Sequence, residues 1–136
     1  MVSIEEVRAI ALALPGVEET VSGHTGEAAW RVRSGQFAWM RGPSATDLRQ
    51  LSELGRDWPS GKVLAVRVGD LGEKEALLAA EPEDLFTIPH FDGYAGLLVR
   101  LDVVDRDRLE EIITDAWLVR APAPVAKEWL AEHGLE

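Results

Sequence analysis

Apolar and polar residues alternate along several short stretches of the chain, and a period of two predicts strands with one buried face. In the clearest stretch, Leu97 and Leu101 would point to one side of a strand and Leu98 and Arg100 to the other. Strands are predicted on this basis over residues 28–33, 36–41, 62–68 and 96–101, with a short edge strand over residues 85–88. The pattern therefore predicts a sheet of about five strands.

The first two strands are predicted to form a hairpin around a two-residue turn at Ser34-Gly35. Pairing of Arg33 with Gln36 would place Trp30, Val32, Phe37 and Trp39 on one face, and Arg31, Arg33, Gln36 and Ala38 on the other. Two tryptophans left in water would forfeit a large free energy of burial. The face that carries them is therefore expected to be the core face.

Helical spacing of apolar residues, together with capping signals, predicts the remaining elements. Ser3 and Glu6 have the spacing of a capping box, and Asp70 and Asp105 are N-cap candidates. Helices are predicted over residues 3–14, 72–80, 105–120 and 124–133, with a less regular helix inside 42–59 and a polar loop over 17–27. These elements predict one α+β domain over residues 1–136, with helices packed on one face of an antiparallel sheet and the other face open.

Composition narrows the class of protein. A chain of 136 residues without a long linker fits one domain. It has no cysteine, which excludes disulfides and thiolate metal sites and suits the cytoplasm. The N-terminus lacks a positive n-region, and no apolar run approaches the roughly 20 residues that a membrane helix needs. We expect a cytoplasmic bacterial protein without a membrane segment; the sequence predicts no oligomeric state.

Charge is distributed unevenly between strands and helices. The four longer predicted strands hold six of the 14 basic residues and none of the 24 acidic ones. By the predicted alternation, Arg31, Arg33, Arg67 and Arg100 share the sheet face opposite the tryptophans. Arginine stems can simply cover a wet sheet face. The sharper interpretation is a surface for an anion, either nucleic acid or an acidic protein, because guanidinium groups bind oxyanions in a bidentate manner.

The net charge of −10 weighs against nucleic acid as the partner. Binding to nucleic acid draws much of its affinity from neutralised phosphates, and an acidic domain repels them. A local basic patch can nevertheless outweigh the sign of the whole chain. The charge pattern therefore leaves both nucleic acid and protein as candidate partners.

Two histidines and one tyrosine stand in glycine-bearing loops. His24 lies near Glu27, and His90 lies near Asp92 and Tyr94. If the two histidines met, they could form a carboxylate-supported metal site or an acid–base pair. Tyr94 could contact a ligand in a small pocket with His90 and Asp92, or simply pack its ring over the loop.

Catalytic motifs do not strengthen the enzymatic alternative. The chain contains no P-loop, no GxGxxG after a strand, no HExxH and no GxSxG sequence. We therefore assign no catalytic residue, expect no cofactor or metal, and regard an enzyme as less favoured than a binding protein.

Longer stretches resemble a known family. The sequences TIPHFDGYAGLLVRLD and DRDRLEEIITDAWLVRAP resemble the C-terminal half of the MmcQ/YjbR family, and ALALPGVEE and WRVRSGQFAWM resemble its N-terminal half. The resemblance covers residues 7–122. It implies a fold like that of type III secretion chaperones: a helix, three strands, a helix, two strands and a helix. The family is labelled as DNA-binding, without an established biochemical role.

Three hypotheses follow from these observations. The first is a binding module that holds DNA on its arginine-bearing sheet face, as the family label implies. The second is a protein-binding module, as the chaperone-like fold implies. The third is a small enzyme or metal-binding protein that uses His24 and His90. The candidate ligand-binding residues are Arg31, Arg33, Arg67, Arg100, His90, Asp92, Tyr94 and His24.

Overall fold

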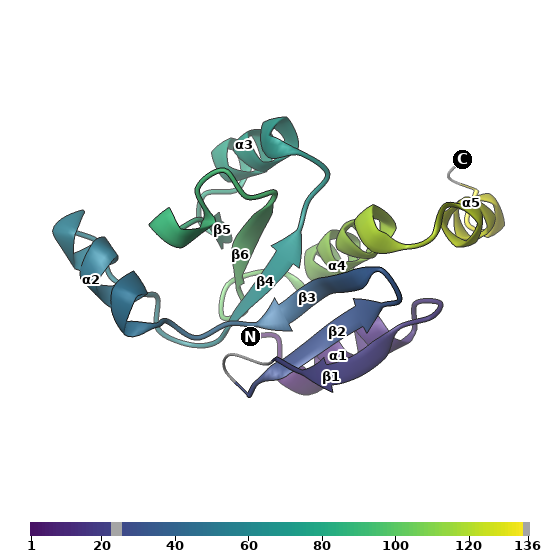
Figure 1. The fold of residues 1–136 in the computed structure, drawn as a ribbon, viewed down its shortest axis with the longest axis horizontal. Coiled ribbons are helices and arrows are strands. Elements are labelled where there is room, and N and C mark those ends of the chain that lie inside the picture. Colours follow the sequence, from purple (N-terminus) through teal and green to yellow (C-terminus); the bar gives the residue numbers. More distant parts are fainter. Residues whose placement is uncertain (23–25, 135–136) are drawn as a thin grey trace.

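The computed structural model describes residues 1–22 and 26–134, and an antiparallel sheet lies at its centre (Figure 1). The six strands are β1 (Glu18–Val21), β2 (Ala28–Val32), β3 (Gly35–Met40), β4 (Val63–Arg67), β5 (Leu85–Phe86) and β6 (Gly96–Arg100). They lie in the order β1-β2-β3-β4-β6-β5, and all neighbouring pairs are antiparallel. The predicted α+β fold class is therefore confirmed, with six strands where the sequence predicts about five.

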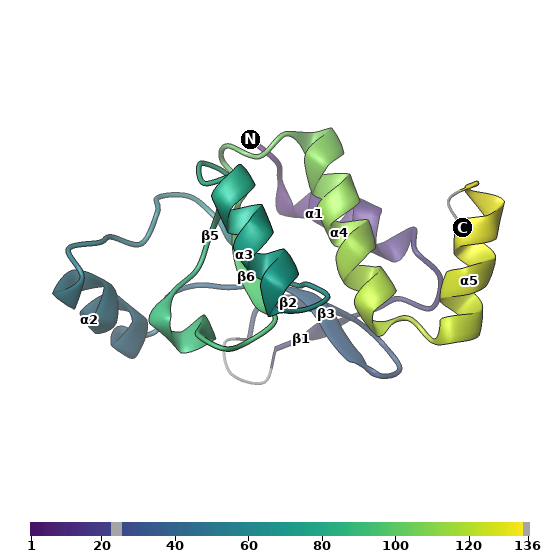
Figure 2. The same ribbon diagram turned by 90° about the horizontal axis from the view of Figure 1, so that it is seen from above.

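The helices lie mainly on one side of this sheet. They are α1 (Ile4–Leu12), α2 (Ala45–Glu53), α3 (Leu71–Ala80), α4 (Arg106–Arg120) and α5 (Ala123–Glu132), with a 3₁₀ helix η1 (Pro89–Phe91). Seen from above, α1, α3 and α4 lie side by side over one face, while α2 and α5 lie at opposite ends of the molecule (Figure 2).

The predicted helix starts are confirmed by hydrogen bonds. Ser3 and Glu6 form both contacts of a capping box at the start of α1. The carboxylates of Asp70 and Asp105 accept backbone N–H groups at the starts of α3 and α4. Ser44, rather than the alternative candidate Thr46, caps α2 and forms a capping box with Asp47. Each cap satisfies N–H groups that have no partner inside the helix.

The main core lies between the sheet and helices α1 and α4. Its largest fully buried side chains include Trp30, Phe37, Leu64, Leu97, Leu109 and Trp117. The indole N–H of Trp30 donates to Glu19 Oε1 at 3.0 Å, and that of Trp117 donates to the Pro15 carbonyl at 3.0 Å. Both large side chains are therefore buried without an unsatisfied donor.

The hairpin register differs from the predicted one. Val32 pairs with Gly35, so the turn residues are Arg33 and Ser34 rather than Ser34 and Gly35. Along β3 the pairing then passes from Gln36 to Ala38, and Phe37 is the extra residue of a β-bulge.

The bulge separates the two tryptophans of the hairpin. Trp30 pairs with Ala38 and packs in the main core, whereas Trp39 pairs with Ala29 and packs on the opposite side of the sheet. The predicted face of four apolar side chains is therefore wrong for Trp39. The reason is that one extra residue exchanges the two faces for every residue beyond it.

The second sheet face carries an apolar cluster of its own. This second cluster consists of Leu51, Val63, Ala65, Phe86, Ile88, Phe91 and Leu98, with Trp39 and Trp58 packed against it. Leu51 comes from α2, and Ile88 and Phe91 come from the segment around η1. The middle of the face that was expected to be open and cationic is therefore covered by apolar side chains.

Strand β1 lies in the segment predicted as a polar loop. Three of its four residues are exposed, so the sequence shows no alternation there. Its position depends on partners elsewhere: Glu19 pairs with Trp30 in the ladder, and its Oε1 accepts from Arg8 Nε at 2.7 Å. Contacts with β2 and α1, rather than local pattern, make this segment a strand.

Trp30 and Trp39 should contribute differently to stability, because the observed register places them on opposite faces of the sheet. Trp30→Ala should lower the free energy of unfolding by about 3–5 kcal/mol, because it empties a fully buried site. Trp39→Ala should cost roughly half as much, since the indole of Trp39 is only partly buried. Urea unfolding of both variants tests this difference. Equal losses would contradict the two-face arrangement.

Candidate functional site

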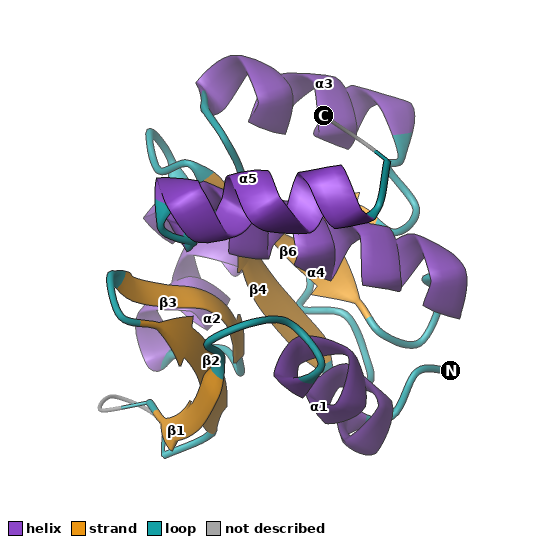
Figure 3. Ribbon diagram, turned by 90° about the vertical axis from the view of Figure 1, so that its right-hand side faces the viewer, coloured by secondary structure: helices purple, strands orange, loops and turns teal. Residues whose placement is uncertain are grey.

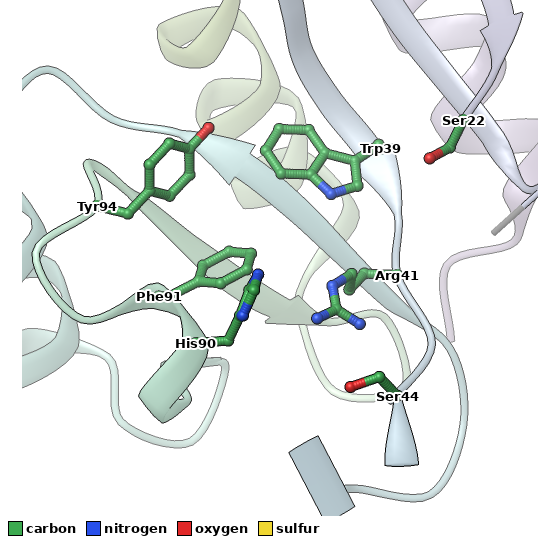
Figure 4. Close-up of a pocket in the computed structure, with 7 residues that line it drawn as sticks. All are labelled: Ser22, Trp39, Arg41, Ser44, His90, Phe91 and Tyr94. Atoms are coloured by element: carbon green, nitrogen blue, oxygen red, sulfur yellow. The ribbon is translucent and has the colours of Figure 1, made fainter. Parts of the chain in front are cut away.

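A pocket of about 640 Å³ lies on the second sheet face, beside the second cluster. Its lining side chains come from separate parts of the chain and are Ser22, Trp39, Arg41, Ser44, His90, Phe91 and Tyr94. Figure 4 shows the side chains of Trp39, Arg41, Phe91 and Tyr94 around a common space, with Ser22 beyond the strand that carries Trp39. We call it the aromatic pocket.

Three aromatic rings form its apolar wall. The ring centroids of Trp39 and Phe91 are 6.4 Å apart, those of Trp39 and Tyr94 are 6.5 Å apart, and those of Phe91 and Tyr94 are 5.5 Å apart. All three pairs are tilted or edge-to-face, which suits the aromatic quadrupole. Phe91 is buried, whereas Tyr94 is 36% exposed. The wall is thus anchored at Phe91 and accessible at Tyr94.

A nearly buried ion pair supplies the polar side of the pocket. Arg41 Nη2 lies 2.7 Å from Asp47 Oδ2, and these side chains are 12% and 1% exposed. The same carboxylate oxygen accepts the backbone N–H of Ser44 at 2.9 Å. Burial acts to raise the pKa of Asp47, but hydrogen bonds from the Ser44 backbone and from Arg41 outweigh it, so the pKa lies below its ordinary value.

Arg41 keeps donors for a ligand. Besides Asp47, its guanidinium donates to the carbonyl of Gly42, and its Cζ lies 5.9 Å from the centroid of the Phe91 ring. Arginine has five N–H donors in a planar fork, which is more than these two contacts use. Asp47 therefore fixes the orientation of the fork without saturating it.

A buried lysine holds the turn that carries His90, Phe91 and Tyr94. Lys74 lies in α3, is 7% exposed, and its Nζ donates to the carbonyls of Phe91 at 2.6 Å and Tyr94 at 2.9 Å. Burial lowers the pKa of Lys74, and the charge of Asp92 partly offsets that effect. Two charge-assisted hydrogen bonds thus tie both ends of the turn to α3.

The position of the Tyr94 ring depends on a close approach to the sheet. A Cβ atom at Gly96 would lie 2.5 Å from Tyr94 Cε2 and 3.1 Å from the Val66 carbonyl oxygen. Gly93 has a φ of +74°, as expected for the predicted turn at Asp92-Gly93. The two glycines therefore allow the turn to bring Tyr94 over β6.

Two of the predicted loop residues line the aromatic pocket. His90 and Tyr94 share the aromatic pocket, and the imidazole ring of His90 lies 6.1 Å from the ring of Phe91. Asp92 is exposed and does not line the pocket. His24 lies outside the described residues, so its predicted meeting with His90 stays a prediction. Within the described residues, no three His, Asp or Glu side chains gather closely enough to hold a metal ion.

The predicted arginines have different neighbours. Arg67 Cζ lies 5.1 Å from the Tyr94 ring, and its Nε donates to the Ala95 carbonyl at 3.1 Å. Arg100 Cζ lies 5.2 Å from the Phe86 ring. Arg31 donates to the carbonyls of Val32 and Arg33 at 3.4 Å, and Arg33 is exposed in the hairpin turn. Arg67 and Arg100 therefore act as aromatic partners within the fold, separated by the second cluster.

Sequence reasoning missed Trp39, Arg41, Ser22, Ser44, Phe91 and Lys74 as site residues. A signal existed for Lys74, which lies three and four residues before Leu77 and Leu78, on the inward stripe of α3. A charged residue on such a stripe is expected to have buried hydrogen-bond partners. For Trp39 and Arg41 no such signal existed. They follow the bulge, so the alternation of residues does not show on which face of the sheet their side chains lie.

Removal of the Lys74 ammonium should loosen the turn. Lys74→Met keeps the length of the side chain but leaves two carbonyls without their donor, which should cost about 1–3 kcal/mol. Hydrogen exchange should accelerate at the amides of Phe91, Asp92 and Tyr94, which bond within the turn. Lys62→Met, at an exposed lysine, is the matched control. Unchanged exchange at these amides would show that Lys74 does not hold the turn.

The ion pair at Asp47 predicts a dependence of stability on pH. Because the folded pKa of Asp47 is depressed, its contribution is present above the unfolded value near 3.8 and is lost as pH falls through the folded value. Asp47→Asn should cost about 3 kcal/mol near neutral pH. The gap between wild type and variant should then narrow below about pH 4.

Chemical unfolding between pH 7 and pH 2 measures this gap. Glu53→Gln is the control, because the Glu53 carboxylate lies 3.9 Å from Arg49 in an exposed pair of little expected value. A gap for Asp47→Asn that stays constant down to pH 2 is inconsistent with the assigned ion pair.

Comparison with known proteins agrees with this architecture. The YjbR family profile matches residues 12–119. Uncharacterized protein Mb2600 of Mycobacterium bovis is 46% identical over 105 residues, which are 77% of this chain and 81% of that protein. Uncharacterized protein Rv2570 of Mycobacterium tuberculosis has the same identity and coverage.

A solved structure shows the same fold. The crystal structure of Deinococcus radiodurans protein DR2400, a DUF419 domain, matches 98% of this chain and 89% of that chain with a TM-score of 0.65 and 19% identity. In the described part of the chain, no helix combines the length and apolar character that a membrane crossing requires. On the profile match and the mycobacterial relatives, this chain belongs to the YjbR family.

Proposed function

We propose that this protein is a small binding module and that the aromatic pocket is its ligand site. The ligand is a planar ring that carries an anionic group. A nucleotide, free or within a single strand, has this chemistry. The observation that carries the proposal is the convergence of Trp39, Phe91, Tyr94 and Arg41 on one cavity.

The size and lining of the pocket support a small ligand. About 640 Å³ lies within the range of roughly 300–1,000 Å³ that is usual for small-molecule sites. Such sites are mostly apolar, with a few polar groups that orient the ligand. Here the partly exposed rings of Trp39 and Tyr94 offer surfaces for a planar group. Arg41 and the hydroxyls of Ser22 and Ser44 offer hydrogen bonds.

The polar groups favour an anion over a cation. Arginine binds phosphate or carboxylate oxygens through parallel N–H groups, and Asp47 holds this arginine in position. Asp47 also offsets the charge of Arg41, so affinity should depend on the ring as well as on the anion. Stacking of a base on aromatic side chains contributes about 1–3 kcal/mol per base.

The family label of DNA binding suggested the arginine-bearing sheet face as the binding surface. We propose the aromatic pocket as the binding site instead. Duplex binding needs an extended surface that contacts many phosphates, and the net charge of −10 opposes it. A ligand with one ring and one phosphate is repelled less than a duplex, and its ring can stack on the aromatic side chains of the pocket. The absence of cysteine supports action in the cytoplasm.

Nucleotide binding can be measured by titration calorimetry and by shifts of the tryptophan indole N–H signals in NMR spectra. The probes are adenosine 5′-monophosphate, adenosine, a short single-stranded oligodeoxyadenylate and its duplex. We expect saturable binding of the monophosphate and single strand, a weaker response to adenosine, and a shift of the Trp39 signal. Tyr94→Ala should weaken binding at least about fivefold, because it removes one stacking surface.

Two arginine variants separate the pocket from the sheet face. Arg41→Gln should weaken binding of the monophosphate but not of adenosine, whereas Arg31→Gln, outside the pocket, should leave both unchanged. Loss of binding in Arg31→Gln with retention in Arg41→Gln would assign the ligand to the sheet arginines instead. Failure of all four probes to move the Trp39 signal at millimolar concentration would refute the proposal.

A further inference from the structure

A second hollow of about 560 Å³ lies between α1, α4 and α5. We call it the helix groove. Its floor includes Ile10 and Leu14 of α1, Leu118 of α4 and Trp129 of α5. Figure 3 shows α5 in front of α4, at the end of the molecule opposite α2. The helix groove is therefore distinct from the aromatic pocket and shares none of its lining residues.

The rim of the helix groove is acidic. Its charged lining residues are Glu110, Glu111 and Asp115 of α4, Arg106 of the same helix, and His133 at the end of α5. Arg106 is already engaged, since its Nη1 lies 3.2 Å from Glu110 and its Nε lies 3.8 Å from Glu6. The rim therefore keeps an excess of negative charge.

Asp115 is the carboxylate that most needs a cation. No ion pair involves it among residues 1–22 and 26–134, whereas Glu111 lies 3.6 Å from Arg108. Although Asp115 is exposed, desolvation by its neighbours raises its pKa. The charges of Glu73 and Glu111 raise this pKa further, and Arg108 acts in the opposite direction. A positively charged partner would relieve this repulsion.

One wall of the helix groove is only loosely attached. No residue of α5 is fully buried. Trp129 contacts Trp117 edge-to-face at 5.7 Å between ring centroids, and the imidazole of His133 stacks on Trp129 at 3.9 Å. Val125 and Trp129 of α5 are only partly buried where they pack against the main core, so few contacts must break for this helix to adjust to what lies beside it.

We propose that the helix groove binds a basic amphipathic helix of a partner protein. The apolar floor accepts the apolar face of such a helix, and the acidic rim accepts its lysines and arginines. Along α4 the lining extends from Arg106 to Leu118, a distance of about 18 Å at 1.5 Å per residue, which matches about three helical turns.

Charge selects this occupant among those that an apolar groove can hold. A second copy of the chain also has a net charge of −10 and would be repelled by the acidic rim. Nucleic acid and anionic lipid are repelled for the same reason. A cationic partner gains both from the local rim and from the net charge of the whole chain, which accelerates its encounter.

The test uses a fluorescent synthetic leucine–lysine helix of about four turns, measured by anisotropy, with a leucine–glutamate helix as the charge-reversed probe. We expect saturable binding of the basic helix and none of the acidic one. Neutralisation of Glu110, Glu111 and Asp115 together (Glu110→Gln, Glu111→Gln, Asp115→Asn) should weaken binding about eightfold, at roughly twofold per screened surface charge.

A matched triple variant separates the helix groove from general attraction to an acidic protein. Glu53→Gln, Asp57→Asn and Glu83→Gln remove the same charge from exposed sites away from the groove. This variant should bind the leucine–lysine helix no more than about twofold more weakly, because only the net charge of the chain has changed. Equal weakening in the two triple variants would overturn the proposal.

The apolar contribution is tested separately. A serine–lysine peptide of the same charge should bind at least about tenfold more weakly than the leucine–lysine helix, since it has no apolar face to bury. Trp129→Ala should weaken binding of the leucine–lysine helix, with urea unfolding to confirm that the main core is intact. Equal affinity of the serine–lysine and leucine–lysine peptides would overturn the proposal, because attraction would then be purely electrostatic.

Discussion

The arrangement of this protein depends on one extra residue in β3. The pairing of β2 with β3 passes over Phe37, and the bulge turns the next residues to the other side of the sheet. Phe37 itself is fully buried in the main core, so the bulge is stabilised by apolar burial rather than tolerated as a defect. As a result Trp39 points away from Trp30 and becomes a wall of the aromatic pocket.

The second sheet face, to which Trp39 is turned, requires a cover. The apolar side chains around Ala65 and Leu98 cannot remain in water without a large loss of free energy. Helix α2 supplies Leu51 and the η1 segment supplies Ile88 and Phe91 to cover them. The cover is incomplete beside Trp39, and the aromatic pocket lies at this edge. The pocket is thus a consequence of how two separate segments close over one apolar patch.

Buried charges hold these covering segments in place. Lys74 reaches from α3 to two carbonyls of the turn, and Arg41 and Asp47 connect the end of β3 to the start of α2. Each group has hydrogen-bond partners that offset part of its desolvation. Because their geometry is specific, such contacts favour one arrangement of the cover over alternatives that would bury a similar apolar area. They therefore explain how a pocket built from loops can have a defined shape.

The sequence by itself determined the α+β class, the helix starts at Ser3, Asp70 and Asp105, and the strands around Leu64 and Leu97, because these depend on local caps and on short-range periodicity. It also put His90 and Tyr94 in one loop, since they are close together in the chain. Only the tertiary structure decided the side on which Trp39 lies, the strand at residues 18–21, and the meeting of Arg41, Lys74 and the turn. Those features depend on a bulge and on contacts between segments far apart in the chain. The local pattern of apolar and polar residues predicts neither.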